Sequence, residues 1–187
     1  VELPDFESMD EVLKVRGEAK GPTDDFLRFI EESPVSATID HFTRGMKAQG
    51  NGSLDLTLDL PLRRLGDTRL RGDYQFQNNQ LQLLAGLPPL TKVNGRLALT
   101  EKSVSAQEIS GQVFGGPLKV QVRSVDGQVV VQAGGRANVG EVASHFALPA
   151  KERLDGTAAW KSDISIRRRN ADFVVESDLV GVSSRFP

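Results

Sequence analysis

Apolar and polar residues alternate along most of this chain, the pattern of strands that bury one face. In the longest run, Gly45 to Leu60, every even position is apolar or glycine and every odd position is polar or glycine. Successive side chains of a strand point to opposite faces, so the run predicts one apolar face and one solvated face. At ~3.3 Å per residue it would span about 50 Å, as one unusually long strand or as two collinear strands bent at Gly50-Asn51-Gly52.

The same alternation recurs downstream and predicts several further strands. Their apolar positions are Leu70, Gly72, Tyr74 and Phe76; Leu81 and Leu83; Val93, Gly95, Leu97 and Leu99; Val104 and Ala106; Leu118, Val120 and Val122; Val129 to Ala133; Ala158, Trp160, Ile164 and Ile166; and Phe173, Val175 and Leu179. Predicted turns separate them at Asn78-Asn79, Glu101-Lys102, Asp126-Gly127 and Arg167 to Asn170. Asp-Gly is a strong two-residue hairpin signal, because a type I′ turn needs positive φ at both positions. The pattern predicts a mainly β fold, a meander of about nine or ten antiparallel strands.

Two short segments have helical spacing instead. Thr23 is a predicted N-cap, followed by two acidic residues and an apolar stripe of Phe26, Phe29 and Ile30. Farther on, Asn138 and Glu141 form a capping-box arrangement at the start of a second helix.

Each predicted helix follows a Gly-x-Ala strand end, at 17–19 and 135–137, and each leads to a strand that opens at Gly52 or Gly156. We therefore expect a loose internal repeat, roughly 12–62 and 129–187, with a strand meander over 66–125 between the two copies.

A sheet with one apolar face must cover that face, and two short helices can cover only part of it. The sheet could close on itself as a sandwich or barrel with an ordinary core. It could stay curved and open, with a lipid or a partner in an apolar groove. It could also be one section of a longer open-ended sheet.

Composition and charge exclude several other classes of protein. The chain of 187 residues has no cysteine, so disulfides and thiolate chemistry are absent, and its net charge of −2 lacks the basic footprint of a nucleic-acid binder. No apolar run approaches the ~20 residues of a membrane-spanning helix. The chain starts without a methionine and both ends resemble interior sequence, so we expect a section of a longer protein.

Candidate catalytic or metal-binding residues are few. The two histidines, His41 and His145, have no ligand-spaced partner, and no Gly-x-Ser-x-Gly elbow is present, so we expect no catalytic site, metal or cofactor. The Arg167-Arg168-Arg169 run fits a solvated turn or contact with anionic lipid headgroups. Trp160, the single tryptophan, fits core packing or ligand contact.

Several short motifs resemble the AsmA-like proteins of Gram-negative envelopes, of the YhdP type. They are Gly17-Glu18-Ala19 before a helix, Phe29 to Val35, the long Gly50 to Leu62 strand, Val93 to Leu97, Val113 to Pro117, and Ser177 to Gly181 with the Phe186-Pro187 ending. The resemblance covers essentially the whole chain.

This resemblance implies a long curved antiparallel β-groove in the periplasm, within a protein anchored in the inner membrane by an N-terminal helix absent from this chain. It implies transport of phospholipid between the inner and outer membranes and maintenance of the outer-membrane barrier. The expected partners are phospholipid acyl chains and the rest of the same long chain, with no nucleic acid. The groove lining would be Leu54, Leu56, Leu58, Leu60, Tyr74, Phe76, Leu97, Leu99, Val120, Val122, Trp160, Ile164, Phe173 and Val175. A non-enzymatic structural or interaction domain with a closed core is the alternative.

Overall fold

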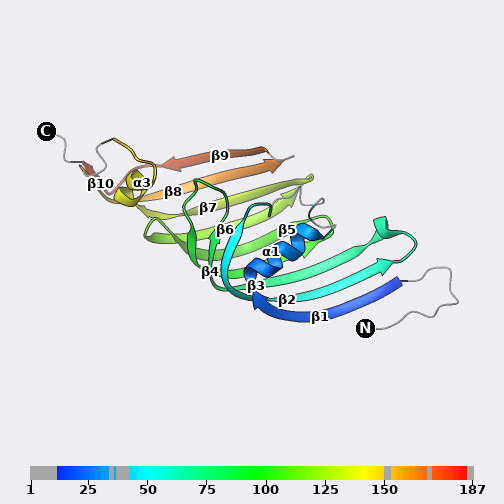
Figure 1. Cartoon of the computed structure of the whole chain (residues 1–187). Helices are drawn as coiled ribbons and strands as arrows, with labels where there is room; N and C mark the ends of the chain where they lie inside the picture. The colour runs from blue at the N-terminus through cyan, green and yellow to red at the C-terminus, as the bar shows by residue number, and fades with distance from the viewer. Residues whose placement is uncertain (1–11, 34–35, 37–42, 150–152, 168–169, 185–187) are drawn as a thin grey trace.

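One large antiparallel sheet makes up most of the molecule (Figure 1). The structure is a computed structural model, and it describes residues 12–33, 36, 43–149, 153–167 and 170–184. The strands are β1 (Val12–Pro22), β2 (Lys47–Pro61), β3 (Arg69–Gln82), β4 (Leu90–Thr100), β5 (Val104–Val113), β6 (Gly116–Val125), β7 (Gln128–Asn138), β8 (Leu154–Arg167), β9 (Asn170–Ser177) and β10 (Val182–Ser184). Two α-helices, α1 (Thr23–Glu32) and α3 (Val139–His145), and a short 3₁₀ turn, η1 (Leu65–Asp67), accompany them.

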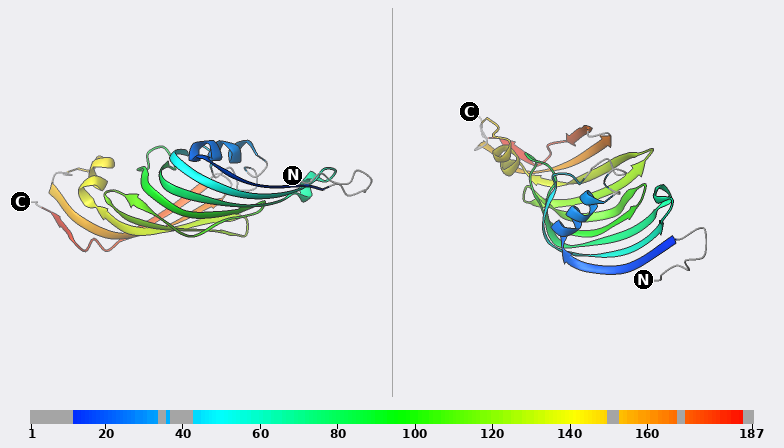
Figure 2. Two further views of the ribbon diagram at one scale, coloured as in Figure 1. Left: turned by 90° about the horizontal axis from the view of Figure 1, so that it is seen from below. Right: turned by 45° about the vertical axis from the view of Figure 1, so that its right-hand side comes forward.

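The strands follow one another through the sheet in chain order from β1 to β8, and both β9 and β10 pair with β8. The sheet curves, and α1 lies inside the curve while α3 lies at the ends of β7 and β8 (Figures 1 and 2). The predicted fold class, a mainly β antiparallel meander with two short helices, is confirmed.

The long alternating run forms one strand and not two. β2 has 15 residues and pairs continuously with β1, from Val12 opposite Pro61 to Pro22 opposite Asn51. The Asp126-Gly127 hairpin is also confirmed, with φ of 50° and 73° at the two turn residues.

The predicted turn at Asn78-Asn79 is wrong, because β3 runs through it. The pairing of β3 with β2 shifts by one residue between Gln49 and Asn51, where Asn78 adopts a φ of 51°. An extra residue of this kind is a β-bulge, which bends the strand and reverses the facing of the side chains beyond it. The bulge turns Asn79 toward the apolar side, where it is fully buried. The strand ends at Gln82, so Leu83 lies beyond it.

The two helix starts differ in how they are capped. Asn138 caps α3 as predicted, since its side-chain oxygen accepts a hydrogen bond from the Glu141 backbone N–H at 3.1 Å. The predicted cap at Thr23 is wrong: the N-cap position of α1 is Pro22, which has no side-chain cap, and Thr23 is buried in the first turn. No helix of the described residues is long and apolar enough to cross a membrane.

The core lies between α1 and the curved sheet, in two adjoining clusters. One contains Ile30 of α1 with Leu70, Leu99, Val104, Ala106, Val122 and Val129 of the sheet. The other contains Leu54, Tyr74, Phe76 and Val93, and Phe26 of α1 packs against both clusters. The helix therefore covers the apolar side of the sheet, which is its concave side.

Candidate functional site: the apolar face

Cross-strand pairing places all fourteen predicted groove residues on one face of the sheet. Residues directly opposite one another in an antiparallel pair share a face. The pairs continue from strand to strand: Leu54 with Tyr74, Tyr74 with Leu97, Leu99 with Val104, Ala106 with Val122, Val122 with Val131, Val131 with Ile164, and Ile164 with Phe173. We call this surface the apolar face; its role as a lipid surface remains a prediction.

Helix α1 covers the part of the apolar face formed by β2 to β4, which we call the covered section. Tyr74 is 2% exposed, Leu99 5% and Phe76 6%. The Phe26 ring stacks on the Tyr74 ring with centroids 4.0 Å apart and planes 14° from parallel. These predicted groove residues are therefore inaccessible to a ligand while α1 is in this position.

A buried polar cluster fixes the first turn of α1 to the sheet. The Tyr74 hydroxyl donates to the Thr23 hydroxyl oxygen at 2.8 Å, and the Asn79 side-chain amide donates to the same oxygen at 2.8 Å. The amide also donates to the backbone carbonyl of Gln49 at 3.2 Å. Burial raises the pKa of the Tyr74 hydroxyl, so this group stays a hydrogen-bond donor. We call Thr23, Tyr74 and Asn79 the polar latch.

Sequence reasoning missed the polar latch, although the sequence carries a signal for it. Glycines stand at the two positions of β2 that the latch approaches. A Cβ on Gly50 would collide with the Asn79 side chain, and a Cβ on Gly52 would collide with the Tyr74 hydroxyl. Paired glycines on the apolar parity of a strand can therefore indicate that another group approaches the backbone closely.

At the other end of the sheet the apolar face is only partly covered, and we call Trp160, Ile164, Phe173 and Val175 the open section. Ile164 is half-buried, Phe173 is 45% exposed and Val175 is 67% exposed. The buried indole N–H of Trp160 has no hydrogen-bond partner in the described part of the chain. An apolar surface on the last strands of a sheet is typical of a binding surface.

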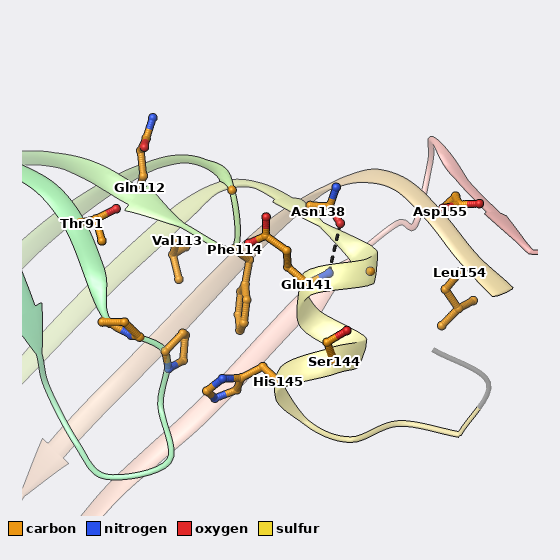
Figure 3. A pocket seen from close by; sticks show the side chains of 14 residues that line it. Thr91, Gln112, Val113, Phe114, Asn138, Glu141, Ser144, His145, Leu154 and Asp155 are labelled. Atoms are coloured by element: carbon orange, nitrogen blue, oxygen red, sulfur yellow. Dashed lines mark hydrogen bonds between the residues drawn. The ribbon is translucent and has the colours of Figure 1, made fainter. Parts of the chain in front are cut away.

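A cavity of about 710 Å³ lies at the strand ends beside α3 (Figure 3). Its lining combines apolar and polar groups, among them Phe114, Glu141 and His145. His145 bonds through Nε2 to the Gly86 carbonyl at 2.9 Å and meets the Phe114 ring edge-on. These contacts connect α3 to the segment between β3 and β4, so the residues that line the cavity have a structural role there.

The polar side of the sheet carries exposed ion pairs. Arg96 approaches Asp73 at 3.0 Å, and Lys119 approaches Glu108 at 3.0 Å. Such exposed pairs contribute little to stability. Among the described residues no group of three or more His, Cys, Asp or Glu side chains could hold a metal ion. His41, Arg168 and Arg169 lie outside the described residues.

Comparison with known proteins adds two findings. The sequence pattern of the family described as "YhdP protein" matches residues 1–187. The chain is 24% identical over 194 residues to the intermembrane phospholipid transporter YhdP of Escherichia coli (strain K12). That match covers 99% of this chain but 15% of the relative, so the chain spans about a seventh of the relative's length. No solved structure is significantly similar to the chain.

Proposed function

This chain belongs to the YhdP protein family, and from this premise we propose that it is one section of an envelope protein that carries phospholipid, with acyl chains lying on the apolar face. The relative named above is an intermembrane phospholipid transporter, which supports phospholipid as the proposed cargo. The proposal assigns no catalytic step to this segment.

The observation that supports it most directly is an apolar face that is continuous across the sheet and exposed on β9. All ten described strands belong to one sheet, so no second sheet of the described residues packs against this face. Acyl chains are as apolar as the side chains they would contact, and their transfer from water to such a surface is favourable. Phe173 and Val175 are exposed on this face and would be covered by a bound acyl chain.

The wider setting is part of the same proposal. We place the segment in the periplasm, within a protein anchored in the inner membrane by an N-terminal helix. The rest of the long chain would continue the apolar face on both sides. A section of this length moves lipid only as part of that longer path.

We further propose that β1-α1-β2 and β7-α3-β8 are two copies of one repeating unit. Ala19 pairs with Leu54, two residues after Gly52, and Ala137 pairs with Ala158, two residues after Gly156. The glycines of the two Gly-x-Ala motifs pair with Leu56 and Trp160, which lie four residues after Gly52 and Gly156. The shared register supports a common origin for the two units.

A closed structural domain is the second candidate, and the covered section favours it. There, α1 and the sheet form an ordinary core around Ile30 and Leu99. This interpretation explains the part of the apolar face under α1 but leaves the open section without a role.

The single tryptophan allows a direct test of the proposed function. Trp160 lies on the apolar face, so phospholipid with brominated acyl chains should quench its fluorescence on contact. The matched control is the double variant Trp160→Phe, Lys161→Trp, which moves the indole to the opposite face of the same strand. Quenching should be several-fold stronger for the native chain than for the control. Equal quenching in both, or none in either, would sink the proposal.

A further inference from the structure

We infer that α1 and a lipid acyl chain are alternative occupants of the covered section, so that α1 is a displaceable gate in the lipid path. This inference rests on the proposed function. Phe26 and Ile30 of α1 pack against the side chains of β2 to β4 that would otherwise continue the apolar face. While α1 is in this position, an acyl chain cannot reach the buried ones, Tyr74, Phe76 and Leu99, and has limited access to the rest.

The contacts of α1 are of two kinds, and a lipid can replace only one of them. Phe26 and Ile30 make apolar contacts, which an acyl chain reproduces, so their exchange would leave little sheet surface exposed to water. The remaining contacts are polar and specific to the helix. They include the polar latch and the hydrogen bond from the Ala48 backbone N–H to the Asp24 carboxylate at 3.2 Å.

The polar contacts gather at the first turn of the helix, while its second half is held by the apolar contacts of Ile30, which is 3% exposed. Thr23 is fully buried, whereas Phe29 is 48% exposed. Near the end of the helix Glu31 makes an exposed ion pair with Arg44 at 3.3 Å, a contact of small energetic weight. The first turn is therefore the anchor of α1, and the helix leaves the apolar face when the polar contacts of this turn break.

A reversible disulfide lock tests the gate. The chain has no cysteine, and the Asp24 carboxylate lies against the Ala48 backbone, so Asp24→Cys with Ala48→Cys would tie the first turn to β2. The lock is placed in the full-length protein that carries this segment, in its native envelope. A photo-crosslinking residue replaces either Leu58, which packs against the cluster of Ile30, or Ile164 in the open section. The two single-cysteine variants are the matched controls.

We expect both probes to form lipid adducts in the reduced protein. Oxidation should lower the yield at position 58 about tenfold, leave the yield at position 164 unchanged, and be reversed by reductant. An unchanged yield at position 58 on oxidation would overturn the gate. So would adducts at position 164 alone in every state, because α1 would then be a fixed wall. Absence of adducts at both positions would instead refute the proposed function, on which the gate depends.

Discussion

Replacing Thr23 by valine tests whether the polar latch is the main anchor of α1. Valine keeps the shape of threonine but removes the oxygen that accepts two buried hydrogen bonds, from Tyr74 and from Asn79. The Tyr74 hydroxyl would be left buried without a partner, at a cost of about 1–3 kcal/mol. Asn79 would lose one bond, about 0.5–1.5 kcal/mol, but keep its bond to Gln49. We expect Thr23→Val to lower the free energy of unfolding by about 1.5–4.5 kcal/mol.

Tyr74→Phe should cost less, because Thr23 still accepts from Asn79 and only one bond, about 1 kcal/mol, disappears. The double variant gives the sharpest result. Adding Tyr74→Phe to Thr23→Val removes the stranded hydroxyl, so the second substitution should restore about 1 kcal/mol instead of removing it.

Urea unfolding followed by far-ultraviolet circular dichroism and Trp160 fluorescence would give the three free energies, provided that the two probes report one transition. Thr23→Ser, which retains the acceptor, is the control and should stay near the native value. The reasoning is refuted if Thr23→Val costs no more than Tyr74→Phe, or if Tyr74→Phe further destabilises the Thr23→Val chain.

Three further outcomes follow from the same contacts. Gly52→Ala should cost about 1–3 kcal/mol because the new methyl group meets the Tyr74 hydroxyl, and Tyr74→Phe should recover part of that loss in urea unfolding. Burial raises the pKa of Tyr74, the single tyrosine, so the chain should lose stability as pH rises from about 10 through the folded-state pKa. Tyrosinate absorbance should therefore appear at a higher pH than for a free tyrosine, and the Tyr74→Phe variant should not show this loss of stability. Val175→Asp and Val174→Asp, at positions 67% and 55% exposed, should each change stability by less than about 0.5 kcal/mol. Only Val175→Asp, on the apolar face, should weaken quenching of Trp160 by brominated lipid; equal weakening by both would contradict the assignment of the face.

The strands could be predicted from the sequence because alternation follows directly from strand geometry. It located β2, the hairpin at Asp126-Gly127 and the common facing of residues as distant as Leu54 and Phe173. Paired residues of neighbouring strands share a face. Once the apolar positions of each strand are known, the residues of the whole apolar face can therefore be assigned.

The errors fall where one residue has two uses that the sequence alone does not separate. Asn78-Asn79 is typical of a turn, but here Asn78 forms a bulge that turns Asn79 inward to the polar latch. Thr23 before two acidic residues is typical of an N-cap, but its hydroxyl accepts from residues more than fifty positions away. Only tertiary contacts decide between these uses. The extent of cover on the apolar face was unpredictable for the same reason, because it depends on where α1 lies.

The chemistry of the polar latch bears on whether α1 is a permanent part of the core or a gate. More apolar side chains in the first turn would have held the helix to the sheet, but such contacts are non-directional and an acyl chain could replace them all. Buried hydrogen bonds add only about 0.5–1.5 kcal/mol each, yet they require one position of the helix relative to β3. The polar latch therefore fixes α1 in one position on the sheet, while the free energy that holds it there is small. This is the combination that a gate needs, because the helix must release the face to lipid and then return to the same place.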